Sequence, residues 1–433
     1  MFRKQLPSAP VHWRACGGET LCWSRRCQST GSFFKSVKPA PADAIFGLVK
    51  PFNADTFPQK ANLYVGVYRD DHGKPFVLES VRRAAVQTLD HTDMDYAPIT
   101  GIPTFVQRAT KVCFGDDMPE EVLERVASVQ TLSGTGALRL GGELIRRVVG
   151  TSSVNMNVSL PTYPNHVNIY KESKLNLLYY PYYDEEKHTV NLPALLTYIK
   201  KLPAHSFVLL HACCHNPTGS DPTHEQWMEV VAAMEECKLI PFVDMAYQGF
   251  ATGDLDKDAF LPRAISRSKV PAFFIAQSFA KNFGLYGHRV GCLHVGCANP
   301  REREVVLSHA SQIARSLYSN PPIYGATIVS TILGDAELTR LWKSEVQLMA
   351  DRLNSIRKRL VEELAACGCP RDFSHLARGV GMTSLTGLSM SQLAAMREEH
   401  HIYMTQDGRI AFSGLNETNV QYVAQKMKEV CTH

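Results

Sequence analysis

The chain has 433 residues, of which 45% are apolar and 20% are charged, a composition that is ordinary for a soluble globular protein and argues against disorder or a coiled coil. Its net charge of +4 is concentrated in residues 1–42, which hold seven Lys/Arg and one acid, so the remainder carries −2. We therefore expect no basic surface for nucleic acid. No run of 18 or more apolar residues occurs, so no membrane span is expected.

The N-terminal segment has the composition of a targeting sequence. It is rich in arginine and serine, nearly free of acids, and lacks the continuous apolar core of a secretory signal. We predict a mitochondrial transit peptide over about residues 1–30, with processing near Arg25–Ser29, and hence a mitochondrial matrix location. The alternative is a disordered cytosolic extension.

The cysteines predict reduced thiols and no metal site. Twelve cysteines occur without the spacing of a disulfide framework. The segment His211-Ala-Cys-Cys-His215 is expected to alternate along a strand, so that its side chains point to opposite faces and cannot converge on one ion.

Apolar segments that alternate with amphipathic helical segments predict an α/β fold with a mostly parallel sheet covered on both faces. The predicted strands are 126–132, 154–158, 175–180, 207–213, 239–243, 273–276 and 290–295. After Arg301 the chain is expected to be mainly helical, with a long helix over 337–366, and the last 65 residues or so form a small α+β unit. We predict an N-terminal arm and part of a small domain over 31–75, a large cofactor-binding domain over 76–345, and a C-terminal small domain over 346–433.

A glycine-rich turn directly follows the first of these strands. Ser133-Gly-Thr-Gly136 precedes a helix expected to begin near Ala137, and the free N–H groups at a helix N-terminus bind anions. The alternative is a simple tight turn. Ligands of such sheets bind beyond the carboxyl ends of the strands, where this turn is expected to lie.

Asp244 occupies a similar position at the end of the strand 239–243. A carboxylate that emerges from so apolar a strand is costly to bury unless it is paired. It is expected either to pair with a ligand cation or to cap the next helix.

Lys281 lies just past the apolar strand 273–276, in the segment Gln277-Ser-Phe-Ala-Lys-Asn-Phe-Gly-Leu-Tyr-Gly-His-Arg289. An arbitrary lysine in a loop is usually solvated. Ser278 and Arg289 are nearby, and this setting suits an amine that forms a Schiff base beside a phosphate.

The segment 277–289 closely resembles the pyridoxal-phosphate lysine segment of the aspartate aminotransferases, within the fold type I, class I aminotransferase family. The resemblance extends from about Ala42 to the C-terminus and is long and nearly ungapped. It implies the pyridoxal-phosphate transferase fold of that family, with Lys281 as the Schiff-base residue and proton carrier.

The resemblance also implies how the cofactor pyridoxal 5'-phosphate is held. Its phosphate would be bound by the turn at 133–136 together with Ser278 and Arg289, and its ring nitrogen by Asp244. Tyr247 and Asn216 would bond the ring oxygen, and His211 would support the ring. Tyr163 would stack on the ring where the family usually has tryptophan. The implied cofactor-binding set is Ser133, Gly134, Thr135, Tyr163, His211, Asn216, Asp244, Tyr247, Ser278, Lys281, Arg289 and Tyr96, the last acting on the partner subunit's cofactor.

Two arginines would determine the substrate. Arg409 matches the residue that binds the substrate α-carboxylate, and Arg315 matches the one that binds the side-chain carboxylate from the neighbouring subunit. A guanidinium suits each task because it offers two parallel N–H bonds to a carboxylate. Gly66 would let the backbone approach the substrate, and Tyr163 and Asn216 would also contact it.

These features imply ping-pong transamination between L-aspartate and 2-oxoglutarate by a homodimer with shared active sites, with amino acids and 2-oxo acids as its small-molecule partners. One alternative is an aromatic or kynurenine aminotransferase on the same fold, which Tyr163 and Thr383 favour and Arg315 opposes. A more remote alternative is a catalytically inactive binding protein, which the presence of Lys281 and Asp244 opposes.

Overall fold

The computed structural model describes residues 32–89, 94–150 and 153–432. Two compact units are distinguished, residues 1–42 and residues 43–433. The described part of the first unit contains a turn in which the Phe33 and Phe34 rings pack edge to face at 5.1 Å. The predicted transit peptide over residues 1–30 lies outside the described residues. All further description concerns residues 43–432.

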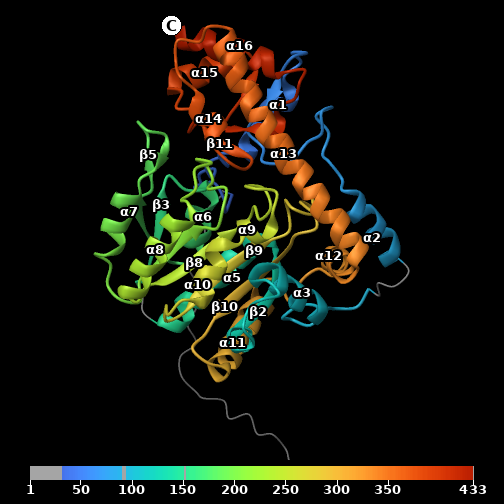
Figure 1. Cartoon of the computed structure of the whole chain (residues 1–433), viewed down its shortest axis with the longest axis vertical. Coiled ribbons are helices and arrows are strands. Elements are labelled where there is room, and N and C mark those ends of the chain that lie inside the picture. Colours follow the sequence, from blue (N-terminus) through green and yellow to red (C-terminus); the bar gives the residue numbers. More distant parts are fainter. Residues whose placement is uncertain (1–31, 90–93, 151–152, 433) are drawn as a thin grey trace, which may run out of the picture. The chain divides into compact units, whose positions relative to one another are not determined.

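A seven-stranded sheet forms the centre of the larger unit (Figure 1). Its order is β2-β10-β9-β8-β7-β3-β4, and every strand pair is parallel except those that β10 makes with β2 and β9. All seven predicted strands are present, with boundaries shifted by no more than two residues at either end. They are β2 (Val126–Leu132), β3 (Asn155–Leu160), β4 (Asn176–Pro181), β7 (Phe207–His211), β8 (Ile240–Met245), β9 (Phe273–Ser278) and β10 (Val290–Gly296).

Side chains that alternate along the central strands enter two separate hydrophobic clusters. In β7, Val208 and Leu210 pack with one cluster and Leu209 with the other, and Phe242 and Val243 of β8 divide in the same way. One cluster is covered by α7 (Leu192–Ile199), α8 (His224–Glu236) and α10 (Phe260–Arg267). The other is covered by α5 (Ser133–Val149), α6 (Pro164–Glu172) and α11 (Pro300–Leu317). The predicted α/β fold with helices on both faces is confirmed.

A smaller group of elements is built from both ends of the chain. β1 (Ala61–Asn62) pairs in parallel with β12 (Ile402–Tyr403), and β11 (Thr383–Leu385) pairs with β13 (Arg409–Ala411). The helices here are α1 (Val49–Ala54), α14 (Ser374–Arg378), α15 (Met390–Glu398) and α16 (Val420–Thr432), with 3-10 turns at Phe46–Leu48 and Phe412–Gly414.

The helix α13 (Ala336–Ala366) connects these elements to the rest of the unit (Figure 1). It begins at Asp335, whose carboxylate accepts hydrogen bonds from the N–H groups of Glu337 and Leu338, which is a typical N-cap. It packs against α2 (Glu79–Leu89) and α12 (Tyr324–Gly334) near its start and against α14 and α16 further on. The long predicted helix over 337–366 is thus present. The predicted domain boundary at 345/346 falls inside α13 and stays a prediction.

The remaining short elements are α3 (Pro103–Phe114), α4 (Glu120–Leu123), α9 (Leu255–Asp258) and the hairpin of β5 (Tyr183–Asp184) and β6 (Thr189–Val190). Among the described helices, none combines the length and the apolar character needed to cross a bilayer.

Candidate active site

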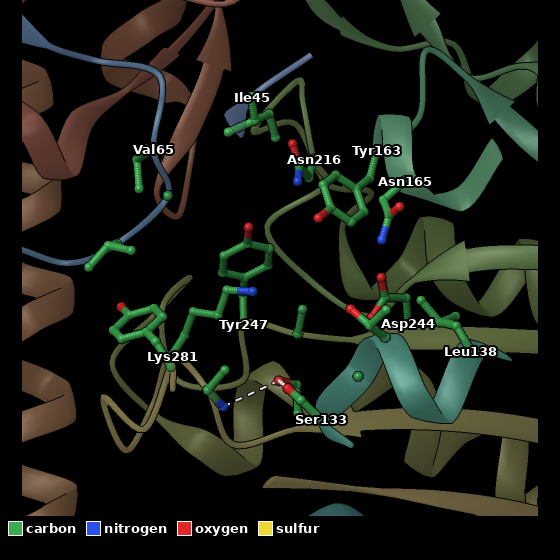
Figure 2. Close-up of a pocket in the computed structure, with 18 of the residues that line it drawn as sticks. Ile45, Val65, Ser133, Leu138, Tyr163, Asn165, Asn216, Asp244, Tyr247 and Lys281 are labelled. Carbon is green, nitrogen blue, oxygen red and sulfur yellow. Dashed lines mark hydrogen bonds between the residues drawn. The ribbon is translucent and has the colours of Figure 1, made fainter. Parts of the chain in front are cut away.

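A cavity of about 560 Å³ opens where β2, β7, β8 and β9 end, at their carboxyl ends (Figure 2). Strand register explains the convergence, because Asp244 of β8 is paired with His211 of β7 and with Ala276 of β9. Thirteen of the predicted site residues line this cavity: Gly66, Ser133, Gly134, Thr135, Tyr163, His211, Asn216, Asp244, Tyr247, Ser278, Lys281, Arg289 and Arg409.

One end of the cavity is built to receive an anion. The helix α5 begins at Ser133, four residues earlier than predicted, so the glycine-rich turn forms the first turn of the helix with its free N–H groups. The hydroxyls of Ser133 and Ser278 lie 2.9 Å apart. The backbones approach closely here, since a Cβ added at Gly134 would lie 3.1 Å from the Ser278 Cβ. Arg289 lines the same cavity and adds a positive charge.

Asp244 presents a free carboxylate oxygen inside the protein. Its Oδ2 accepts a hydrogen bond from His166 Nε2 at 2.9 Å, whereas its Oδ1 is buried and has no hydrogen-bond partner among the described residues. Burial acts to raise the pKa of the Asp244 carboxyl, but the hydrogen bond from His166 and the electrostatic attraction of neighbouring groups such as the Lys281 amine outweigh it, so the pKa is lowered. The side chain is therefore held as an anion and can pair with a protonated ring nitrogen.

The segment from His211 to His215 differs from its predicted geometry. The strand β7 ends at His211, and Cys214 adopts a φ of +52°, so the side chains do not alternate beyond that point. The predicted alternation through His215 is therefore wrong, and the turn brings the rings of His211 and His215, which an extended strand would keep four residues apart, to within 4.1 Å of each other. Burial lowers the pKa of His211 to about 3. Within the part of the chain that the structure describes, no three His, Cys, Asp or Glu side chains form a group that could hold a metal ion.

Lys281 reaches into the cavity beside Tyr247, with its Nζ 5.0 Å from the centre of the tyrosine ring (Figure 2). Burial lowers the pKa of the Lys281 amine to about 8, against the raising effect of Asp244, and the charges of Arg289 and Arg409 lower it further. A fraction of the amine is therefore neutral near physiological pH. A neutral amine can act as a nucleophile or as a base.

The polar groups of Tyr247 and Asn216 line the cavity together with Gly66. A Cβ placed on Gly66 would lie 3.9 Å from the Tyr247 hydroxyl, so the glycine keeps this side open. Burial raises the pKa of the Tyr247 hydroxyl, which therefore stays protonated and can donate a hydrogen bond. Tyr163 also lines the cavity and packs edge to face on His166, with ring centroids 5.3 Å apart.

Arg409 is 3% exposed and is positioned by neutral oxygens. Its Nη2 donates to the Tyr64 carbonyl at 2.6 Å, and its Nη1 donates to Asn216 Oδ1 at 3.3 Å. Among the described residues, no carboxylate lies within salt-bridge distance of this guanidinium. A buried cation without a counter-ion is costly, so the site favours a ligand carboxylate.

Two predicted residues lie outside the cavity. Tyr96 is 83% exposed, and Arg315 lies in the last turn of α11 with its side chain exposed and its guanidinium bonded to Ser319 Oγ. Both were expected to act on the active site of a second subunit, so their roles stay predictions.

Several lining residues were not singled out from the sequence. Ile45 and Phe46 come from the 3-10 turn region, Asn165 from the start of α6, and Tyr286 from the lysine segment, where its hydroxyl accepts the Tyr68 N–H at 2.9 Å. They were missed because a single apolar, aromatic or amide side chain gives no chemical signal of its own in a sequence.

The donor set fits pyridoxal phosphate. The cavity contains an anion-binding end, a buried carboxylate oxygen without a partner, and a lysine with a lowered pKa. These three features match the phosphate, the ring nitrogen and the aldehyde of that cofactor.

The model of the family "Aminotransferase class I and II" matches residues 58–427. The chain belongs to this family. The aminotransferase is 45% identical over 403 residues to the mitochondrial aspartate aminotransferase of Arabidopsis thaliana, an alignment that covers 93% of each protein. It is 42% identical over 410 residues to the cytoplasmic aspartate aminotransferase of Gallus gallus, covering 93% of this chain and 98% of that protein.

Solved structures of the family superpose closely on the aminotransferase. A mitochondrial aspartate aminotransferase from Trypanosoma brucei is 50% identical with a TM-score of 0.85, over 89% of this chain and 99% of that one. An aromatic-amino-acid aminotransferase from Burkholderia pseudomallei, covalently bound to pyridoxal phosphate, is 38% identical with a TM-score of 0.88, over 93% of this chain and 100% of that one.

Proposed function

We propose that this aminotransferase catalyses reversible transfer of the amino group from L-aspartate to 2-oxoglutarate, giving oxaloacetate and L-glutamate. The observation that carries the proposal is that Lys281, Asp244 and Arg409 converge on one cavity. The chain is also similar to aspartate aminotransferases along nearly their whole length. The presence of Lys281, Asp244 and Arg409 in one cavity of a chain from this enzyme family opposes a binding protein without catalysis.

The family depends on pyridoxal phosphate, and this chain's residues provide a place for each part of that cofactor. Ser133, Gly134, Thr135, Ser278 and Arg289 would hold the phosphate. When bound, the cofactor supplies an electron-withdrawing ring that stabilises negative charge at the substrate Cα.

A second group of residues would hold the ring. Asp244 would hold the ring nitrogen in its protonated form, because its Oδ1 has no other partner. Tyr247 and Asn216 would bond the ring oxygen, while Tyr163 and His211 would lie against the ring.

Lys281 would move the proton. Its Nζ would accept the proton from the substrate Cα and return it later in the reaction. The lowered pKa of about 8 suits this role, because a general base works best when its pKa is near the operating pH. His166 supports this step indirectly, since its hydrogen bond keeps Asp244 ionised.

Substrate recognition would combine two subunits. Arg409 binds the α-carboxylate within its own chain, and Gly66 leaves room for it. Arg315 of a second copy binds the side-chain carboxylate, and Tyr96 of that copy reaches the cofactor phosphate. We infer a homodimer with shared active sites, because both residues match positions that act across subunits in the family and lie outside the cavity of their own chain.

We place the enzyme in the mitochondrial matrix. The support is the composition of residues 1–30 and the mitochondrial aspartate aminotransferases among its relatives. Cytoplasmic and chloroplastic aspartate aminotransferases are also among the relatives, so the proposed matrix location depends mainly on the composition of residues 1–30. Import of a fluorescent fusion with and without residues 1–30 tests it.

A second candidate is transamination of aromatic amino acids. Apolar side chains of Ile45, Phe46, Val65 and Leu138 line the same cavity, and aromatic aminotransferases are among the similar structures. The purified enzyme with pyridoxal phosphate should be assayed with a panel of amino acids and 2-oxoglutarate. A kcat/KM for aspartate at or above that for phenylalanine and tyrosine supports the first function, and the reverse order supports the second.

A further inference from the structure

A second cavity, of about 320 Å³, lies behind the active site. Cys213 lines both cavities. One wall of the second cavity is formed by the loop at 219–222 and the start of α8, and the other by α14, Gly379 and Val380. The two walls are connected by a hydrogen bond, in which the Val380 N–H donates to the Gly219 carbonyl at 2.8 Å. The cavity is therefore enclosed by elements of the sheet region and by elements of the C-terminal region.

Two arginines, Arg371 and Arg378, lie near a pair of histidine rings at one end of this second cavity. The imidazole rings of His188 and His375 are stacked with centroids 3.8 Å apart. Burial lowers the pKa of both rings, that of His375 to about 4 despite its hydrogen bond to the Leu385 carbonyl, and Arg371 and Arg378 lower both further. Asp372 and Asp184 act in the opposite direction on His188, but they contribute less than the arginines. An anion bound here would be attracted by the same arginines.

Trp227, Arg378 and Lys257 provide hydrogen-bond donors in the wall of this cavity. Trp227 is 3% exposed, and its indole N–H, which can only donate, has no acceptor among the described residues. The exposed side chain of Arg378 donates to the Ser374 hydroxyl and makes no salt bridge with any described carboxylate. Lys257 Nζ lies 4.0 Å from Asp254 Oδ2 at an exposed position, and such an ion pair contributes little to the free energy of folding.

The two carboxylates that line the cavity are already satisfied by the protein. Asp221 accepts the N–H groups of Cys214 at 2.6 Å and His215 at 2.8 Å, one with each oxygen. Asp258 accepts the N–H groups of Gly249, Ala251 and Thr252. Burial raises the pKa of both carboxyls, that of Asp221 to about 6. The backbone N–H groups thus engage both carboxylates from within the protein, which leaves the donors of Trp227 and Arg378 to face an anionic ligand.

We propose that this second cavity binds a small phosphorylated metabolite, with its phosphate held between Arg378 and the Trp227 indole N–H. Its volume is near the lower limit of about 300 Å³ for small-molecule sites and exceeds the needs of a bare phosphate ion. The stacked rings of His224 and Phe260, 3.9 Å apart, form one wall for the rest of the ligand. Because Trp227 belongs to α8 and Arg378 to α14, the ligand would connect the two sides of the cavity.

Calorimetric titration of the pyridoxal-phosphate-loaded enzyme with glycerol 3-phosphate, in phosphate-free buffer, tests this proposal directly. We expect saturable binding of one molecule per chain. Arg378→Gln should weaken binding about 10- to 100-fold because it removes a charged donor, and Trp227→Phe about 3- to 10-fold because it removes the N–H and keeps an aromatic ring. The exposed Arg301→Gln and Lys201→Gln variants, which remove charges away from the cavity, should bind as the wild type does.

A succinate arm separates this cavity from the active site. Saturating succinate, a dicarboxylate without an amino group, should leave the titration unchanged, and the Arg378 and Trp227 variants should retain aspartate turnover, which shows that they are folded. The proposal is overturned by the absence of saturable binding up to about 10 mM, at the weak limit of useful affinity. Equal affinity of Arg378→Gln and Arg301→Gln, or displacement by succinate, would overturn it as well.

Discussion

The cofactor side and the substrate side of the active site differ in how completely one chain builds them. On the cofactor side, Ser133, Asp244 and Lys281 are held by strand ends and surrounded by protein. On the substrate side, Arg409 is in place, whereas Arg315 is exposed and outside the cavity. The comparison shows that one chain gathers the residues of the cofactor side in one cavity, while the proposed selection for a second carboxylate would depend on another copy of the chain.

Removing the lysine should produce the largest loss, because it affects the chemical step for every substrate. Lys281→Ala should lower kcat by more than about 10³-fold, since the proton loses its carrier. The cofactor should still bind through the phosphate site, which spectroscopy of the dialysed protein can check. Turnover like that of the wild type would disprove the role given to Lys281.

Removing the distal arginine should divide the substrates into two groups. Arg315→Leu should cost aspartate and glutamate on the order of 2–5 kcal/mol of transition-state binding, or roughly 30- to several-thousand-fold in kcat/KM. Aromatic amino acids should lose little, because they have no second carboxylate. An equal loss for phenylalanine and aspartate would show that Arg315 acts on stability or chemistry instead.

Asp244→Ala tests the cofactor side without touching the lysine. The ring nitrogen would lose its anionic partner, and kcat should fall by about 10²-fold for aspartate and aromatic substrates alike, the scale seen when one preorganised electrostatic contact is removed. Exchange of the substrate Cα proton, followed by NMR in deuterated water, should slow in parallel. Unchanged exchange would contradict the proposed role of Asp244.

The pH dependence of cofactor capture should give the smallest effect. Because the Lys281 pKa is lowered to about 8 from 10.5, the neutral amine becomes dominant above that pH. The rate at which the cofactor-free enzyme captures pyridoxal phosphate should rise with pH and level off above about 8. A rate that continues to rise to about pH 10 would indicate an ordinary, solvated lysine.

Sequence patterns predicted where the strands begin and end better than they predicted how the strands pair and which side chains touch. The apolar runs of β2 and β9 are visible because buried strands are continuously hydrophobic, and Ser133 and Asp244 follow from their positions at strand ends. The antiparallel direction of β10 was not predicted, since pairing direction depends on residues far apart in the chain. The close rings of His211 and His215 were missed for a local reason, because Cys214 turns the backbone where a strand was expected to continue.

The shared active site is tested most directly by mixing two inactive variants. Lys281→Ala and Arg315→Leu, each with little aspartate activity alone, should form mixed dimers in which one site has both defects and the other has neither. In a fully exchanged equimolar mixture, half the dimers are mixed and each has one intact site, so aspartate activity should return to about a quarter of the wild-type value. No recovery, despite subunit exchange demonstrated with tagged chains, would place Arg315 in its own subunit's site or outside the active site altogether.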